Sequence, residues 1–246
     1  MRKIREMKKD KIYSQPKNTI DDFRFNDDIA NVFEDMARRS IPGYNLLLEN
    51  VGVITKRYAT PKTTLYDLGC SLGAGIVQLA EHSPQNCIII GIDNSEAMLK
   101  KCRANVKKIR TDKKIEIRLE DIEQSHMENS SVVLMNWTLQ FVSPSEREEL
   151  IAKVCASLND GGVLVLSEKI AISDREQEIT FLNLHEKFKQ ENGYSLLEID
   201  QKRKAIEQVL KTETEDKHLQ RLKRGGFRNI YKFFQNYNFA SFLAIK

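Results

Sequence analysis

The feature that most constrains the fold is a regular alternation of short, mostly apolar segments with amphipathic ones over residues 64–167. Apolar runs of this kind are typical of strands that are covered on both faces, and the segments between them carry apolar residues at helical spacing. Strands that alternate with helices indicate right-handed βαβ units and a parallel sheet. We therefore predict an α/β protein with a doubly wound sheet.

The expected strands are 64–67, 87–93, 115–119, 131–136 and 163–167. The expected helices between them are 73–81, 95–106 and one from Ser143, where Ser143-Pro144-Ser145-Glu146 has the form of a capping box and Gly161-Gly162 ends the helix.

Further helices are expected on both sides of the alternation, at 26–39, 47–58, 174–190 and 195–211, with a shorter one ending at Gly225-Gly226. We expect one domain over residues 1–246. Residues 21–60 form its N-terminal helical segment, and residues 173–225 form a helical insertion that serves as a lid or a dimer contact. Residues 228–246 predict two strands joined by a tight turn near 236–238.

Composition excludes several classes of protein. The chain is 41% hydrophobic and 30% charged, which is typical of a globular protein, and it has no apolar run near the roughly 20 residues of a membrane-spanning helix. The net charge of +4 is a weak signal for nucleic acid, so we expect no direct contact with it. Residues 1–11 are basic and no apolar stretch follows them, so we expect a frayed tail and not a secretory signal.

The four cysteines are widely spaced and form no CxxC pair, so we expect buried thiols, no metal site and a cytoplasmic location. The four histidines have no partners that the sequence identifies, and we expect solvated or packing roles for each.

A glycine-containing turn follows the first expected strand, with the sequence Asp67-Leu-Gly-Cys-Ser-Leu-Gly73. Glycine at this point permits a tight turn and lets a ligand approach the backbone closely. The dinucleotide pattern GxGxxG is not met, since Ser71 occupies the place of the second glycine, and no GK[ST] phosphate loop follows. The turn therefore predicts a cofactor site that is neither for NAD nor for ATP.

Polar residues end three further strands: Asp93 and Asn94, then Asp121, then Asn136. In an open α/β sheet, ligands bind at the carboxyl ends of the strands, and an acid at the end of the second strand can accept hydrogen bonds from ribose hydroxyls. Each of these residues taken alone is more often a turn or capping residue. Their joint placement favours a nucleoside site.

This arrangement resembles the class I S-adenosylmethionine-dependent methyltransferases, from about residue 64 to 167 and again in the terminal hairpin. The resemblance implies a Rossmann-like sheet of seven strands with the last strand antiparallel, and a nucleoside bound between Asp93 and Asp121-Ile122. The motifs of nucleobase methyltransferases are missing, because Asn136-Trp-Thr-Leu139 replaces Asn/Asp-Pro-Pro-Tyr and no Pro-Cys occurs. For Trp137, core packing and a ligand contact stay equally open.

The helix expected from Ser195 carries an arginine within its apolar stripe. Glu198 completes a capping box with Ser195. The stripe contains Leu196, Ile199, Arg203, Ile206 and Leu210, while Lys202 and Lys204 are expected to point elsewhere. A desolvated arginine needs an anion, and its planar fork suits a carboxylate. The alternative is a structural salt bridge, with Glu207 as the expected partner.

A closer resemblance covers nearly the whole chain beyond residue 20: the chain is similar to the carboxy-S-adenosyl-L-methionine synthase family. The matching stretches include Phe33–Met36, Ser40–Tyr44, Tyr66–Ala74, Ile92–Ser95, Asn136–Phe141, Ser143–Arg147, Leu166–Lys169, Asn192–Tyr194 and Gln201–Arg203. The resemblance implies that S-adenosylmethionine or its carboxylated product is held by Tyr44, Gly69, Cys70, Ser71, Asp93, Asn94, Asp121, Ile122, Asn136 and Arg203. It also implies a catalytic role for Arg203, as the group that binds the carboxylate.

The implied reaction converts S-adenosylmethionine and prephenate to carboxy-S-adenosylmethionine and phenylpyruvate, without metal, in a homodimer. The product would serve a second enzyme that modifies the wobble uridine of transfer RNA. Two alternatives stay open at this stage. One is an ordinary methyltransferase acting on a small carboxylic acid, and the other is an RNA-binding module with a vestigial nucleotide pocket.

Overall fold

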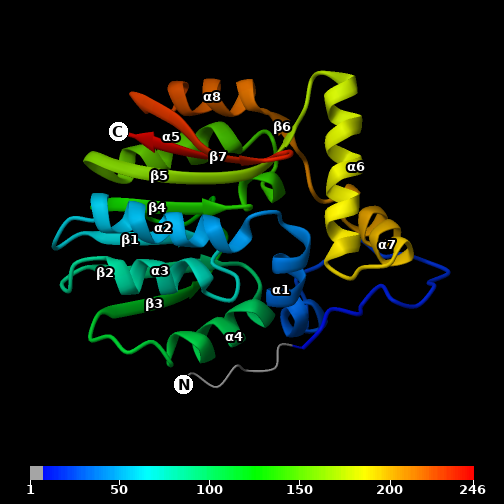
Figure 1. The fold of residues 1–246 in the computed structure, drawn as a ribbon. Coiled ribbons are helices and arrows are strands. Elements are labelled where there is room, and N and C mark those ends of the chain that lie inside the picture. Colours follow the sequence, from blue (N-terminus) through cyan, green and yellow to red (C-terminus); the bar gives the residue numbers. More distant parts are fainter. Residues whose placement is uncertain (1–7) are drawn as a thin grey trace.

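The computed structural model describes residues 8–246 (Figure 1). The helices are α1 (Asp27–Ser40), α2 (Tyr44–Tyr58), α3 (Ala74–His82), α4 (Glu96–Val106), α5 (Arg147–Ser157), α6 (Arg175–Glu191), α7 (Leu196–Glu207) and α8 (Glu215–Arg224), with the 3-10 helix η1 (Leu139–Phe141). The strands are β1 (Thr64–Leu68), β2 (Ile88–Asp93), β3 (Lys114–Leu119), β4 (Ser130–Asn136), β5 (Leu158–Ala171), β6 (Glu213–Thr214), β7 (Asn229–Asn236) and β8 (Phe239–Ile245).

One sheet with strand order 3-2-1-4-5-8-7 runs through the molecule. Strands β1 to β5 are parallel, and β8 is antiparallel to both β5 and β7. The expected doubly wound sheet with an antiparallel last strand is therefore confirmed. The two-residue strand β6, which pairs with the end of β5, was not predicted.

Helices cover both faces of this sheet (Figure 1). Alternate residues of each strand point to opposite faces, so Val132 and Leu134 of β4 pack with α2, α3 and α4, while Val133 and Met135 pack with α5 and α8. All four of these side chains are fully buried. Burial on both faces explains the continuous apolar runs of the parallel strands.

The start of α5 differs from the prediction. The helix begins at Arg147, and Glu146 is its N-cap without a side-chain capping bond, so the expected capping box at Ser143 is wrong. The Ser143 hydroxyl instead lies 2.8 Å from that of Ser145. Fully buried Arg147 explains the shift: its guanidinium donates to the carbonyls of Val142 and Lys211, which fixes the preceding residues as a turn.

The end of α5 also differs. The helix ends at Ser157, and β5 begins at Leu158, so Gly161-Gly162 lies inside the strand and does not end the helix. The register between β4 and β5 shifts at this point, and Gly161 has a φ of +75°. The glycines therefore serve an irregularity in the strand.

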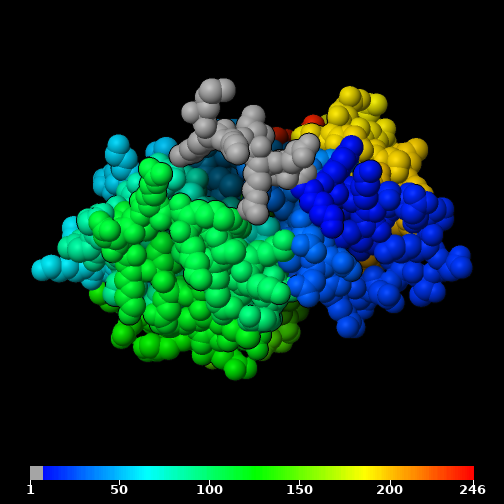
Figure 2. All heavy atoms as spheres, turned by 90° about the horizontal axis from the view of Figure 1, so that it is seen from below, coloured from blue at the N-terminus to red at the C-terminus, as the bar shows by residue number. Residues whose placement is uncertain are grey.

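The N-terminal residues contradict part of the predicted frayed tail. Residues 1–7 lie outside the described part of the chain, but Asp10 is buried and accepts a hydrogen bond of 2.6 Å from the Tyr194 hydroxyl. The side-chain amide of Gln201 on α7 donates to the carbonyls of Tyr13 and Gln15. These long-range bonds, which sequence spacing does not reveal, attach the N-terminal segment to the helical insertion, and the two lie side by side in Figure 2.

The insertion lies beside the carboxyl ends of the strands. There α6 and α7 stand next to α1, apart from the layers of the sheet (Figure 1). The predicted capping box between Ser195 and Glu198 is present at the start of α7. Among residues 8–246, no helix is long and apolar enough to cross a membrane.

Candidate functional site

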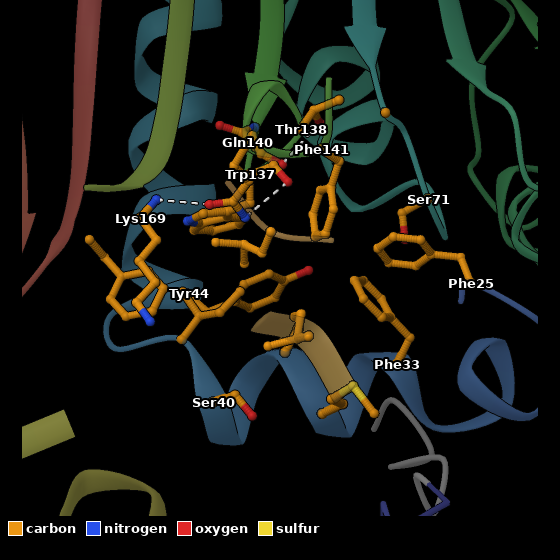
Figure 3. Close-up of a pocket in the computed structure, with 18 of the residues that line it drawn as sticks. Phe25, Phe33, Ser40, Tyr44, Ser71, Trp137, Thr138, Gln140, Phe141 and Lys169 are labelled. Carbon is orange, nitrogen blue, oxygen red and sulfur yellow. Dashed lines mark hydrogen bonds between the residues drawn. The ribbon is translucent and has the colours of Figure 1, made fainter. Parts of the chain in front are cut away.

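A cavity of about 930 Å³ opens where the carboxyl ends of the strands meet α1, α2, α6 and α7. Its volume lies at the upper end of the range of roughly 300–1,000 Å³ for small-molecule sites. Figure 3 shows Tyr44, Trp137 and Lys169 together on one side, and Phe25, Phe33 and Ser71 on the other. The cavity thus has two sides of different chemistry.

The glycine turn forms the floor of the cavity. The N–H groups of Gly69 and Cys70 donate to the carbonyl of Ile92 at 2.8 and 3.0 Å, which joins the end of β1 to the end of β2. Gly69 has a φ of +77°, and a Cβ there would collide with the side chain of Thr138. Ser71, in the place of the family's middle glycine, also adopts a positive φ of 51°. Ser71 therefore adopts the left-handed conformation that glycine takes up most easily.

Asp93 sits at the end of β2 and faces the cavity. One of its carboxylate oxygens accepts from the N–H of Ser71 at 2.8 Å, and the other from the N–H of Ser95 at 2.9 Å. Burial raises the pKa of Asp93 above its ordinary value. Each carboxylate oxygen keeps a free lone pair, so Asp93 can still accept hydrogen bonds from two ribose hydroxyls.

Asn94, Ile122 and Asn136 also line the cavity. The Asn136 side-chain carbonyl accepts from the Ser167 hydroxyl at 2.8 Å, which fixes its orientation. Asp121 is exposed and lies outside the lining. Its carboxylate accepts from the Asn94 amide at 2.9 Å, so it is placed to orient Asn94.

Tyr44 and Trp137 form a stacked pair with ring centroids 5.4 Å apart. Tyr44 begins α2, and burial raises its pKa to about 12, so its hydroxyl is protonated at neutral pH. Trp137 follows β4 with a φ of +57°, a strained backbone for a bulky residue. Both rings line the cavity, so Trp137 is accessible to a ligand, and its contact with one stays a prediction.

An aromatic wall on the Ser71 side was not predicted. The Phe25 ring makes edge contacts with Phe23, Phe33 and Phe141, at centroid distances of 5.2, 6.0 and 5.3 Å. The Ser95 hydroxyl donates a hydrogen bond of 2.5 Å to the carbonyl of Phe25. The FxF spacing of Phe23 and Phe25 could have drawn attention to them, but the wall forms only because the N-terminal segment folds back over α4.

Arg203 lines the cavity but does not have the environment that was expected. Its side chain is 57% exposed, and it pairs with Glu186 of α6 at 2.6 Å. The prediction of a desolvated arginine is therefore wrong, and so is Glu207 as its expected salt-bridge partner. The physical reason is that α7 lies at the rim of the cavity, where its Arg203 face meets α6 and solvent.

Three lysines missed as site residues also line the cavity: Lys169 at the end of β5, Lys189 on α6 and Lys202 on α7. Lys202 was expected to point elsewhere, yet its amine donates to the Ser40 hydroxyl at 3.0 Å. Burial lowers the pKa of Lys189 to about 8, with repulsion from Lys169 and Lys202 adding to the effect. Burial likewise lowers the pKa of Lys202 to about 8 and that of Lys169 below its ordinary value.

His185 of α6 faces the same cavity. Burial and the neighbouring lysines lower its pKa to about 3, so the ring is neutral at pH 7. Its Nε2 lies 2.8 Å from the carbonyl of Ser40, which can only accept, so this nitrogen carries the proton. The bond ties α6 to the end of α1.

Two buried acids lie at or next to the cavity: Asp67 lines it, and Glu168 lies behind its wall. Burial, with repulsion from Asp93, raises the pKa of Asp67 to about 7. Burial raises the pKa of Glu168 to about 8, although Arg147 opposes the shift. A Glu168 oxygen accepts from the N–H of Leu139 at 3.0 Å, at the start of η1. Glu168 therefore fixes the segment that carries Trp137 and Phe141.

The chemistry of the remaining candidates is limited. The four cysteines are free and buried, and burial raises the pKa of the Cys87 thiol. Within residues 8–246, no three His, Cys, Asp or Glu side chains gather in a way that could hold a metal ion.

The fold and cavity define the class of the protein: an open α/β sheet in which a glycine turn and Asp93 line a cavity at the carboxyl ends of the strands. A methyltransferase domain model matches residues 65–162. A cyclopropane synthase from Mycobacterium tuberculosis has a TM-score of 0.58 at 15% identity, covering 75% of this chain and 62% of its own. Human N-acetylserotonin methyltransferase, solved with S-adenosylmethionine, has a TM-score of 0.57 at 12% identity, covering 89% and 55%. The chain therefore has the class I methyltransferase fold.

Curated relatives narrow the class to a family. A carboxy-S-adenosyl-L-methionine synthase of Pseudoalteromonas atlantica is 45% identical over 239 residues, covering 97% of this chain and 98% of the relative. Those of a Shewanella species and of Hahella chejuensis are 46% and 44% identical, with 96% and 97% of this chain covered and 98% of each relative. The chain belongs to the carboxy-S-adenosyl-L-methionine synthase family, and the resemblance seen in its sequence is confirmed.

Proposed function

We propose that this enzyme converts S-adenosylmethionine and prephenate to carboxy-S-adenosylmethionine, phenylpyruvate and water. The observation that carries the proposal is the two-sided cavity. The glycine turn and Asp93 form a nucleoside site on one side, and the cationic side chains of Lys169, Lys189, Lys202 and Arg203 line the other. An ordinary methyl transfer requires no such cationic lining, whereas prephenate carries two carboxylates. The full-length similarity to the named synthases supports the same assignment.

The reaction balances without a further reactant. As the ring of prephenate becomes aromatic, it releases CO₂ and hydroxide. Hydroxide takes a proton from the methyl group bound to sulfur, and the resulting carbon forms a bond to CO₂. A C–H bond beside sulfonium is too weakly acidic for an ordinary side-chain base. The task of the protein is to hold both molecules together and to exclude water.

The side chains divide this task between the two sides of the cavity. We propose that Tyr44, Gly69, Cys70, Ser71, Asp93, Asn94, Ile122 and Asn136 hold S-adenosylmethionine, with Asp121 acting through Asn94. Ser71 is fixed to Asp93 by a hydrogen bond of 2.8 Å, so the loop is preorganised for the ligand. Arg203 binds the carboxylate of the product. The aromatic wall around Phe25 and the N-terminal segment limit the entry of solvent.

The remaining parts of the proposal concern the surroundings of the enzyme. We propose that it acts in the cytoplasm, that it forms a homodimer through its helical insertion, and that it does not bind nucleic acid itself. Its product would serve a second enzyme that modifies transfer RNA. Four free, buried thiols suit a reducing compartment. Several apolar side chains of α6 and α7, including Leu184, Leu196 and Leu197, are exposed and available to a second copy.

The second candidate is a methyltransferase that acts on a small carboxylic acid, because the cationic side would bind such an acid too. Mass spectrometry separates the two. The purified enzyme is incubated with S-adenosylmethionine, with and without prephenate, and the nucleosides are analysed. We expect a species heavier than S-adenosylmethionine by one CO₂ that forms only with prephenate, in step with phenylpyruvate. S-adenosylmethionine alone, after prephenate is added, would refute the synthase activity.

A further inference from the structure

Cationic side chains from three separate elements meet at one end of the cavity. Lys169 comes from the end of β5, Lys189 from α6, and Lys202 and Arg203 from α7. Figure 3 places Lys169 beside Tyr44 and Trp137, away from Ser71 and the nucleoside side. The pKa of Lys189 is lowered by Lys169, Lys202 and Arg203, in that order after burial, so these charges lie close together.

The four cations differ in how their charges are balanced. Arg203 has Glu186 at 2.6 Å. Lys202 donates to Ser40, and Asp10 and Asp35 favour its charged form. In the described chain, the amines of Lys169 and Lys189 form no ion pair, and the one acid that favours the charge of Lys189 is Glu186, which Arg203 already binds. Partly buried, unpaired cations are costly unless a ligand supplies the anion.

We propose that Lys169 and Lys189 bind the carboxylate that prephenate keeps, the one that remains in phenylpyruvate. This inference rests on the proposed function. The two carboxylates of prephenate have different fates: the ring carboxylate leaves as CO₂, and the keto-acid carboxylate does not react. A cation on the departing carboxylate stabilises it before the reaction and so raises the barrier to its loss. A cation on the unreacting carboxylate positions the substrate without that penalty.

The assignment divides the cations by role. Arg203, at the rim, binds the carboxylate newly formed on the sulfonium methyl group. Lys169 and Lys189 hold the other molecule by its unreacting end. Beside Lys169, Tyr44 and Trp137 provide aromatic surface for the ring that becomes aromatic (Figure 3). His185 is neutral and bonded to Ser40, so it holds α6 in place and adds no charge.

The test measures binding as well as turnover. Lys169→Met and Lys189→Met remove one charge each at similar length. Lys187→Met, on the same helix, is the matched control, because Lys187 is exposed, pairs with Glu191 and does not line the cavity. We expect KM for prephenate to rise roughly 10-fold to 100-fold in each cavity variant, as for a lost charge-assisted bond. In both cavity variants, kcat and the calorimetric affinity for S-adenosylmethionine should stay near the wild-type values. The control variant should match the wild type in all of these measurements. Lys189→Arg keeps the positive charge, so its KM for prephenate should lie much closer to the wild-type value than that of Lys189→Met.

Phenylpyruvate is the decisive probe, because it carries only the retained carboxylate. Its affinity, measured by calorimetry in the presence of S-adenosylmethionine, should fall by the same factor as that of prephenate. A loss for prephenate with no loss for phenylpyruvate would assign the lysines to the departing carboxylate and overturn the proposal. Unchanged affinity for both would overturn it as well.

The binding measurements stay informative whatever the enzyme makes. If the wild type forms no carboxylated product but the lysine variants still lose affinity for both acids, the proposed function fails and the anion site stands. If the product forms normally in both variants at the wild-type KM, the anion site fails and the proposed function stands. Circular dichroism melting shows whether each variant is folded.

Discussion

The guanidinium of Arg203 lies at the rim of the cavity, in contact with both solvent and Glu186. An ion pair this exposed contributes little to stability, typically about 0–1 kcal/mol. We therefore expect any role of Arg203 to come from the ligand that it binds. An arginine has five N–H donors, and the contact with Glu186 uses one of its nitrogens, so the fork keeps donors for a ligand carboxylate.

For Arg203→Ala we expect a melting temperature within about 2 °C of the wild type and at least a roughly 100-fold loss of carboxylated product, as for a lost charged hydrogen bond. Glu186→Gln is the matched control, since it breaks the same ion pair and keeps the arginine. It should retain product formation. Equal losses in the two variants would show that the ion pair, and not a ligand contact, accounts for the effect.

At the scale of elements, the segment from Trp137 to Phe141 depends on one acid of the neighbouring strand. Glu168 accepts the N–H of Leu139, and burial raises its pKa to about 8. The unfolded chain has an ordinary glutamate with a pKa near 4.3. The folded state therefore holds a proton that the unfolded state releases, so the stabilising contribution is greatest below pH 4 and is lost as pH rises through 8.

Glu168→Gln removes this ionisation and keeps the acceptor for Leu139. We expect the free energy of unfolding of the wild type to fall relative to the variant by roughly 2–3 kcal/mol between pH 6 and pH 9. Urea titrations of both proteins across that range provide the measurement. A constant difference between them would mean that Glu168 ionises normally in the fold.

At the scale of the whole molecule, the cavity gathers charges that lie far apart in the sequence. Lys189 faces Lys169 of β5, Lys202 and Arg203 of α7, and Glu186 of its own helix. Lys202 faces Arg39 and Asp35 of α1, and Asp10. Folding costs free energy where these cations approach, and we expect a bound carboxylate to offset that cost.

The pH dependence of substrate binding follows from the same charges. Lys189 and Lys202 have pKa values of about 8, so both are protonated at pH 7 and lose charge as the pH rises through 8. We expect KM for prephenate to rise between pH 7 and pH 9, while the affinity for S-adenosylmethionine stays nearly constant. Lys169→Met should move this rise to higher pH, because Lys169 lowers the pKa of Lys189. If KM in the variant rises over the same pH range as in the wild type, the pH dependence belongs to a group other than Lys189.

The fold could be predicted from the sequence because it depends on local patterns. Apolar strands at 64–68 and 88–93, the glycine turn between Gly69 and Gly73, and the acid at position 93 report their structure through neighbours a few residues away. The same residues carry the family resemblance. Predictions were wrong where contacts with residues distant in the sequence decided the structure. Arg147 is an example, because its buried hydrogen bonds make α5 begin later than predicted.

The amino-acid sequence by itself determined the sheet, the strand-end residues that line one side of the cavity, and the family. Only the tertiary structure decided the other side: that Phe25 closes over Ser95, that Lys169, Lys189 and Lys202 face one space, and that Arg203 pairs with Glu186. The physical reason is that periodicity reports which face of an element is apolar, whereas charge balance depends on which faces of different elements meet. Packing between residues far apart in the sequence decides which faces come into contact, and no local sequence pattern predicts this packing.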